Sequence, residues 1–212
     1  MPVKTDRQYR KIDIRNMEAR EDQGDMIVEG YATVFDEPYT LWADGGMEVR
    51  EVIDAHAFDG CDMGDVIFQY DHVGRVFART RNGTLTITPD ERGLHIRANL
   101  GGTEIGRQLY EEIKGGYTDR MSFGFTIDRE KEERSEDQEG RVTVLSRILG
   151  IKKLYDVSAV SLPANDATEI SARCRFQGAM ERARQEQLEK AEREKKKKQI
   201  KILLEVRKND LR

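Results

Sequence analysis

The stretch Arg120-Met121-Ser122-Phe123-Gly124-Phe125-Thr126-Ile127 decides the fold, because its residue types alternate with a period of two. Large apolar residues occupy every second position, and small or polar residues lie between them. Alternate side chains of a strand point to opposite faces, so we expect the apolar set in the core and Ser122 on the other face. Ser122 is held between bulky neighbours and has a glycine two residues on, which makes it a candidate nucleophile. The alternative is an ordinary small residue on the polar face of a strand.

Strand-like runs with turn signals between them recur on both sides of this stretch. The predicted strands are Ile12–Met17, Met26–Phe35, Val66–Tyr70, Val76–Thr80, Thr84–Thr88, Gly93–Leu100, Arg120–Asp128, Val142–Leu149 and Ile151–Leu162. Asn82-Gly83 predicts a hairpin between Val76–Thr80 and Thr84–Thr88. Many short strands with one or two interposed helices predict an α+β fold built on a mostly antiparallel, closed or nearly closed β-barrel.

One helix is predicted in this region. Ile105, Leu109 and Ile113 recur at four-residue spacing, Thr103 precedes them as a candidate N-cap, and Gly115-Gly116 ends the pattern.

Two segments are too charged to belong to a core. Asp128–Arg141 contains 11 charged residues among 14, which predicts an exposed, mobile loop. Residues 181–200 contain 13 charged residues among 20, so the chain from Phe176 onward is expected to be a solvated helix or a disordered tail. We therefore predict a β-barrel domain over residues 1–175 and a charged helical or disordered tail over residues 176–212.

Composition narrows the class of protein. Hydrophobic residues make up 37% and charged residues 36%, and the net charge of −4 gives no reason to expect nucleic-acid binding. Cys61 and Cys174 match neither a metal-ligand spacing nor a disulfide framework, so we expect free thiols, no metal and no cofactor. No apolar signal segment and no membrane-length apolar run is present, so we expect a soluble, intracellular protein.

A nucleophilic serine needs a base, and the chain contains three histidines. His56 lies in a predicted turn or short helix, and His95 lies on the polar side of a predicted strand. His72 follows the apolar strand that ends at Tyr70 and precedes a glycine-containing turn, where an imidazole is both fixed and reachable. His72 is therefore the candidate base.

Asp156 is the candidate for the third member of a catalytic triad. It interrupts the apolar run Ile151–Leu162, and a carboxylate within a core strand is costly unless it is paired. His72 would provide such a partner and would be oriented by it. The alternatives are an ion pair with Lys152, Lys153 or an arginine, or a strand edge that faces solvent.

Six sequence blocks occur in an order typical of one family. They are Gly30–Phe35; Glu51-Val52-Ile53 with Ala57-Phe58; Asp71-His72 with Gly74-Arg75; Gly93-Leu94; Met121–Phe125; and Asp156-Val157-Ser158 with Pro163-Ala164-Asn165. Over about residues 10–172 the chain resembles the prohead proteases of tailed double-stranded DNA bacteriophages. The chain departs from the family pattern at His56, where the family usually has a small residue.

The resemblance implies a fold like that of herpesvirus assembly proteases, a β-barrel flanked by helices. It also implies peptide-bond hydrolysis through an acyl-enzyme. Ser122 and His72 match the family's serine and histidine, whereas Asp156 is our own assignment. The resemblance also implies an enzyme packaged inside the procapsid in the host bacterial cytoplasm, which cleaves the scaffolding segment of the major capsid protein and then itself. It further suggests a homodimer. The tail after Phe176 fits a removable assembly-targeting segment.

Two other functions remain open from the sequence. A scaffolding or capsid-assembly factor could use a protease-like barrel only for binding and would not need Ser122. An esterase could use the same serine and histidine, although the Gly-x-Ser-x-Gly elbow of α/β-hydrolases does not occur in the chain.

Overall fold

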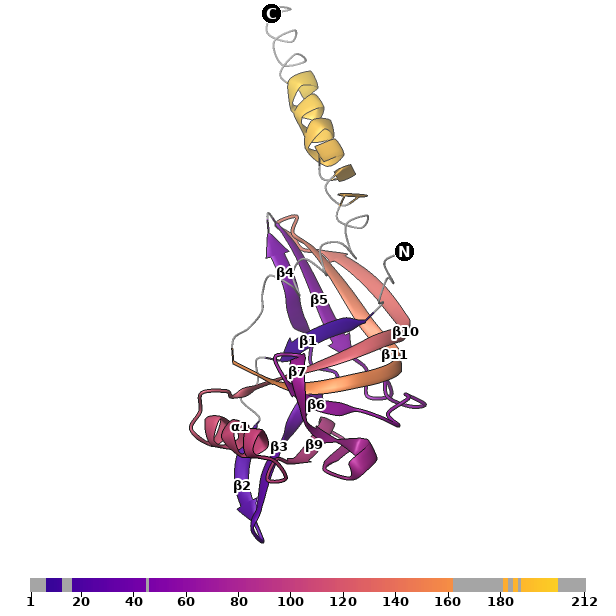
Figure 1. Ribbon diagram of the computed structural model, residues 1–212. Helices are drawn as coiled ribbons and strands as arrows, with labels where there is room; N and C mark the ends of the chain where they lie inside the picture. Colours follow the sequence, from indigo (N-terminus) through magenta and orange to yellow (C-terminus); the bar gives the residue numbers. More distant parts are fainter. Residues whose placement is uncertain are drawn as a thin grey trace, which may run out of the picture.

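The computed structural model describes residues 7–12, 17–44, 46–161, 181–182, 185–186 and 188–201. Two β-sheets dominate the described part of the chain (Figure 1). The larger sheet contains β1 (Gln8–Ile12), β4 (Tyr39–Asp44), β5 (Met47–Ile53), β6 (Ile67–Tyr70), β7 (Val73–Arg79), β10 (Arg120–Glu136) and β11 (Val142–Val160). The smaller sheet contains β2 (Glu18–Asp22), β3 (Asp25–Val34), β8 (Leu85–Pro89) and β9 (Gly93–Asn99). The prediction of a strand-rich α+β fold is confirmed.

The long strands β10 and β11 organise the larger sheet. They pair with each other in antiparallel fashion, and β1 adds to the other edge of β10. The other edge of β11 is divided, since Val142–Ile148 pairs in parallel with β5 and Asp156–Ala159 pairs in parallel with β6. β4 pairs with β5, and β7 pairs with β6, so the sheet divides into two separate ends. The described strands therefore do not close into the predicted barrel.

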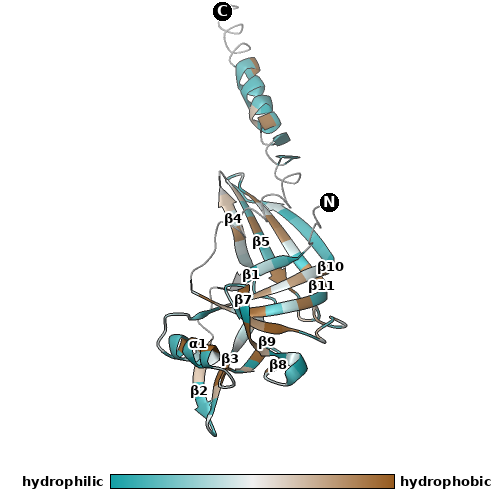
Figure 2. Cartoon of the chain, viewed as in Figure 1, coloured by the Kyte–Doolittle hydropathy of each residue, from teal (hydrophilic) through white to brown (hydrophobic). Residues whose placement is uncertain are grey.

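The main hydrophobic core joins residues of the two sheets. Met121, Phe123 and Phe125 of β10 are buried, as their alternation predicts. They belong to one hydrophobic cluster with Val28 of β3 and Ile96 of β9. Figure 2 shows apolar residues on the strands of the body and hydrophilic residues on the outer part of β10.

The predicted helix is confirmed as α1 (Glu104–Lys114). Thr103 caps it, because the Thr103 hydroxyl accepts a hydrogen bond of 3.1 Å from the backbone N–H of Gly106. Leu109, Tyr110 and Ile113 are buried on one face, and the helix contacts β2 and β3. α1 therefore covers part of the smaller sheet.

The predicted hairpin around Asn82-Gly83 is wrong. A short 3₁₀ helix, η1 (Thr80–Asn82), follows β7, and Gly83 has the positive φ of 73° that a glycine adopts readily. However, β7 pairs with β6, and β8 pairs with β9. The turn signal marks the place where the chain passes from one sheet to the other, because tertiary packing selects the partner of each strand.

The predicted loop over Asp128–Arg141 is also wrong in its secondary structure. β10 continues to Glu136, and its residues from Arg129 onward are exposed. Their backbone groups pair with the first part of β11, whose Val142 and Val144 are buried. Backbone pairing with a half-buried partner therefore outweighs the high charge of the segment.

The strand predicted over Ile12–Met17 falls mostly on residues 13–16, which lie outside the described residues, so it stays a prediction. A strand boundary differs from the prediction at Gly150. Two strands were predicted on either side of Gly150, but β11 runs through this residue without a break. A glycine with a strand-compatible backbone does not need to end a strand.

The described residues between 181 and 201 are helical and exposed (Figure 1). Two ion pairs connect this region to β10: Arg134 to Glu186 at 3.0 Å, and Lys190 to Glu136 at 2.6 Å. The predicted boundary between residues 175 and 176 lies outside the described residues, so the division into domains stays a prediction. Among the described residues, no helix has the length and apolar character needed to cross a membrane.

Candidate active site

Ser122 lies in β10, between β1 and β11. It is in register with Lys11 on one side and with Ser158 on the other. Its chain neighbours Met121 and Phe123 belong to the core, so the Ser122 side chain points to the opposite face of the strand. The residue is fully buried at 0% exposure. A hydroxyl in this position has little freedom to leave its partners.

His72 occupies a tight turn between β6 and β7. Asp71 and His72 form the two-residue connection, and both have positive φ values, 48° and 59°. Two such residues in succession are typical of a type I′ hairpin turn. The backbone N–H of Asp71 donates a hydrogen bond of 3.0 Å to the carbonyl oxygen of Ala159 in β11. The turn is therefore held against the strand that contains Asp156.

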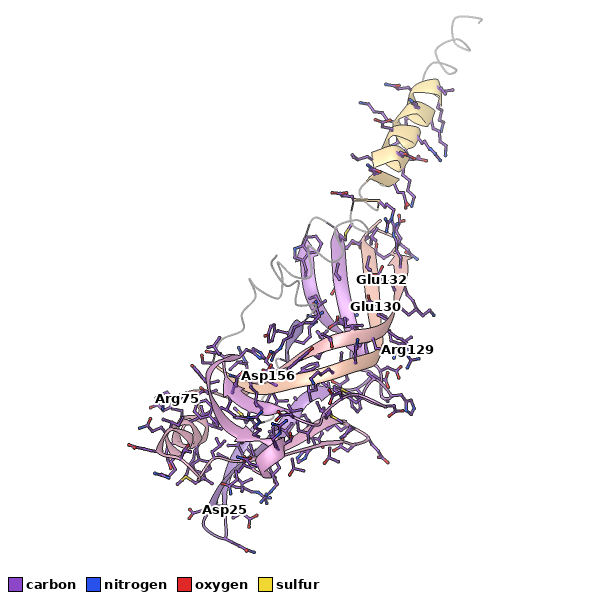
Figure 3. All side chains as sticks on the ribbon, turned by 45° about the vertical axis from the view of Figure 1, so that its right-hand side comes forward. Asp25, Arg75, Arg129, Glu130, Glu132 and Asp156 are labelled. Atoms are coloured by element: carbon purple, nitrogen blue, oxygen red, sulfur yellow. The ribbon has the colours of Figure 1, made fainter. Side chains whose placement is uncertain are left out.

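These elements bring Ser122, His72 and Asp156 into contact. The Nε2 atom of His72 lies 2.5 Å from the Oγ atom of Ser122. The Nδ1 atom of the same imidazole contacts the Oδ2 atom of Asp156. The imidazole thus joins the hydroxyl to the carboxylate through its two ring nitrogens. In Figure 3, Asp156 lies within the body, whereas Arg129, Glu130 and Glu132 lie farther along the large sheet.

The Asp156 carboxylate is completely buried and has several partners. Its Oδ2 atom accepts a hydrogen bond of 2.9 Å from the Ser158 hydroxyl, and its Oδ1 atom forms an ion pair with Arg7. Of the alternatives left open by the sequence, pairing with an arginine is therefore realised together with the contact to His72. Lys153 pairs instead with Asp62 at 2.6 Å. These contacts compensate for the cost of burying the charge.

Gly124 makes room for the carboxylate. It is in register with Asp156, and a Cβ atom at this position would lie 2.3 Å from Oδ1 of Asp156. It would also lie 2.9 Å from the ring of Tyr9. Even the smallest side chain would therefore displace the groups around Asp156.

The N-terminal strand covers the site. The Tyr9 ring packs on the His72 imidazole with a centroid distance of 4.5 Å. The Arg7 guanidinium stacks between aromatic rings, 5.1 Å from Tyr9 and 4.6 Å from Tyr155. The carbonyl oxygen of Arg10 accepts a hydrogen bond of 2.8 Å from the Ser122 hydroxyl. These contacts leave the His72 side chain only 11% exposed.

A buried ion pair anchors the same strand on the opposite face. Arg10 contacts both carboxylate oxygens of Glu51, at 2.5 Å and 2.9 Å, and the Tyr39 hydroxyl donates to Glu51 at 2.6 Å. Burial disfavours the charge of Arg10, but Glu51 and Tyr39 outweigh this effect and raise the pKa of the guanidinium. Arg10 is 2% exposed and Glu51 is 0% exposed.

The other two histidines lie outside this cluster. His56 is a surface residue that pairs with Asp59 at 3.0 Å. His95 lies in β9, and its ring packs against Tyr31. Among the described residues, no three His, Cys, Asp or Glu side chains gather as a metal site.

Sequence reasoning assigned no role at the site to Arg7, Tyr9, Arg10 or Ser158, although Ser158 belongs to one of the family-typical blocks. The two-residue spacing of Asp156 and Ser158 on a strand places both on one face and could have identified Ser158. No sequence signal points to Arg7 or Tyr9, because their proximity depends on the pairing of β1 with β10.

A hydroxyl, an imidazole and a carboxylate connected in this order are the arrangement that serine hydrolases use to attack acyl groups. The carboxylate orients the imidazole, and the imidazole removes the proton of the hydroxyl. The geometry is therefore suited to a serine hydrolase.

Comparison with known proteins identifies the family. The family described as caudovirus prohead serine protease matches residues 10–183, and the chain therefore belongs to that family. Members of this family are serine proteases of the phage prohead, and they act in capsid maturation. Among solved structures, the capsid assembly protease of bacteriophage T4 is similar, with 11% identity and a TM-score of 0.39; the match covers 74% of this chain and 96% of that chain. No curated protein matches the chain.

Proposed function

We propose that this protein is a serine endopeptidase of capsid maturation with Ser122 as nucleophile, His72 as general base and Asp156 as the group that orients His72. The observation that supports this proposal is the continuous series of contacts from Ser122 Oγ through both ring nitrogens of His72 to Asp156. Such a series is needed to activate a hydroxyl whose free form is a weak nucleophile.

The reaction proceeds through an acyl-enzyme. As the Oγ atom of Ser122 attacks the substrate carbonyl carbon, Nε2 of His72 takes the hydroxyl proton. The imidazolium then delivers that proton to the leaving amine, and the carbon–nitrogen bond breaks. In the second half of the reaction, Nε2 takes a proton from water as the water oxygen attacks the ester carbon. The imidazolium then returns this proton to Oγ of Ser122 as the carbon–Oγ bond breaks and the acid product leaves.

Asp156 supports the imidazole in both halves of the reaction. A carboxylate at Nδ1 fixes the tautomer in which Nε2 carries a lone pair, and it stabilises the imidazolium that forms. The Ser158 hydroxyl and Arg7 hold the carboxylate in place. The Ser158 Oγ atom also lies 3.2 Å from Nδ1 of His72, so it contacts both members of the pair.

The proposed substrates are the scaffolding segment of the major capsid protein and then the protease itself, within the procapsid in the host cytoplasm. The active form is proposed to be a homodimer. Family membership supports the capsid protein as a partner, because a prohead protease acts where capsid subunits have already assembled.

The test is co-expression with the major capsid protein of the same phage, with products measured by intact mass spectrometry. Wild type is expected to trim the capsid protein and its own chain, whereas Ser122→Ala leaves both intact. Ser146→Ala is the matched control, because Ser146 is also a fully buried serine of the large sheet but lies outside the cluster. If capsids assemble and wild type cuts nothing, the protein is instead a non-catalytic assembly factor.

A further inference from the structure

The position that a substrate must reach is occupied by this chain's own backbone. Ser122 is 0% exposed, and its hydroxyl donates a hydrogen bond of 2.8 Å to the Arg10 carbonyl oxygen of β1. The Arg10 carbonyl carbon is bonded to that oxygen at about 1.2 Å, so the peptide group after Arg10 lies beside the Ser122 hydroxyl. This peptide group presents its oxygen, not its carbon, to the hydroxyl, and it fills the space that a substrate strand needs.

The contact with Arg10 competes with activation of Ser122. A hydroxyl has one proton, so it cannot donate fully to the Arg10 carbonyl and to Nε2 of His72 at the same time. The Tyr9 ring also closes the space beside the imidazole. With β1 in place, the triad is assembled but shielded.

β1 binds as an added strand. It pairs antiparallel with β10 from Gln8 opposite Phe125 to Ile12 opposite Met121. Backbone hydrogen bonds of this kind do not depend on side-chain identity, so another extended segment can pair with the same edge of β10. The edge is therefore a general site for an extended peptide.

The Arg10 side chain is the part of β1 whose contacts depend on the identity of the residue. The Arg10 guanidinium contacts both oxygens of Glu51 and lies over the Phe125 ring at 5.7 Å. If β1 left, the buried Glu51 would lose both guanidinium contacts, which is unfavourable for a carboxylate with 0% exposure. An incoming strand with arginine or lysine at this position restores the pair, and the planar guanidinium fits it best.

We propose that residues 7–12 occupy the substrate groove, and that a substrate strand displaces them and places arginine or lysine in the Glu51 pocket, so that the peptide bond after this basic residue faces Ser122. This inference rests on the proposed function, because it names the substrate class of the same site. It assigns β1 as an internal occupant that keeps the nucleophile covered until a suitable segment competes.

The first test measures the rate at which a fluorophosphonate probe labels Ser122 in the full chain. Tyr9→Ala removes the ring that covers His72 and is expected to increase the rate at least tenfold. Tyr31→Ala is the matched control, because it removes an aromatic ring from another histidine, His95, outside the site. Equal rates in all three chains overturn the inference and leave the proposed function standing. No labelling of Ser122 in any chain overturns the proposed function.

A second measurement uses the wild-type chain and does not depend on a variant. Amide hydrogen exchange is compared before and after the probe has reacted with Ser122. Exchange in Gln8–Ile12 is expected to increase at least tenfold, while Asp156–Ala159 keeps its protection through pairing with β6. Unchanged protection of Gln8–Ile12 on the modified chain overturns displacement.

The third test addresses the basic residue. The peptide Arg-Gln-Tyr-Arg-Lys-Ile, which copies residues 7–12, is added to the Tyr9→Ala chain during labelling. It is expected to slow labelling at least tenfold, whereas the same peptide with glutamine in place of the second arginine slows it less than twofold. Equal protection by the two peptides overturns the assignment of the Glu51 pocket.

Discussion

The Nε2 atom of His72 lies 2.5 Å from the Oγ atom of Ser122, although 50 residues separate them in the chain. His72 lies in a turn, and Ser122 lies near the start of the strand β10. Their contact arises because β11 pairs with β6 on one edge and with β10 on the other. The turn that contains the base and the strand that contains the nucleophile are therefore both held by β11.

Ser122 and His72 are expected to act as a unit. Ser122→Ala and His72→Ala should each lower kcat by at least about 1000-fold, because neither a nucleophile without a base nor a base without a nucleophile performs the step. The double variant should be no slower than the worse single variant. The measurement is cleavage of a capsid-protein substrate at saturating concentration. Multiplicative losses in the double variant would show that the two residues act independently.

Asp156→Asn should lower kcat less than His72→Ala does, because the carboxylate orients the imidazole and does not bond to substrate. The expected loss is still on the order of 1000-fold or more, since an amide favours the wrong imidazole tautomer. Circular dichroism serves as the control for folding. Wild-type activity in a folded Asp156→Asn chain would remove Asp156 from the mechanism.

Ser158→Ala is expected to lower kcat about tenfold with KM unchanged. One hydrogen bond to a charged carboxylate contributes about 1.5 kcal/mol, which corresponds to that factor. Ser158→Thr retains the hydroxyl and should restore most of the activity. A loss that threonine does not rescue, or a change in KM alone, would contradict a positioning role.

Gly124→Ala is expected to abolish activity and to lower Tm by several degrees. The new Cβ atom would lie 2.3 Å from the Asp156 carboxylate, so the triad must shift. Gly102→Ala is the matched control, because no atom lies within 4 Å of a Cβ atom there. Thermal unfolding and peptide cleavage are measured on both variants, and equal behaviour would show that the site tolerates the added methyl group.

The Cys61 thiol is expected to react slowly with iodoacetamide at pH 8. Burial raises its pKa from 9.0 to about 11, so folding favours the neutral thiol and the reactive thiolate appears only as the pH rises toward that value. In a Cys174→Ser background, the rate should be at least about tenfold below that of free cysteine at pH 8. The rate of alkylation of Cys61 should continue to increase above pH 9.5. A rate that levels off near pH 9 would indicate a thiol with an ordinary pKa that is only sterically shielded.

Residue patterns in the sequence predicted secondary structure correctly where one face of a strand or helix is buried. The alternation around Ser122 predicted which side of β10 faces the core, and the spacing from Ile105 to Ile113 predicted α1. The same reasoning failed at Asp128–Arg141, because composition describes the solvent-exposed side chains and not the backbone partner that β11 supplies. It also assigned the wrong partner to β7, since a turn signal does not say which strand lies on the next edge.

The sequence by itself determined which residue types were available for chemistry: one serine presented from an apolar strand, one histidine after a buried strand and one carboxylate inside a third strand. Only the tertiary structure decided that these three meet, because strand pairing joins residues far apart in the chain. The tertiary structure alone also placed β1 over Ser122 and Arg10 against Glu51. Hydrogen bonding along a strand edge is independent of sequence, so the choice of partner depends on the packing of the whole fold.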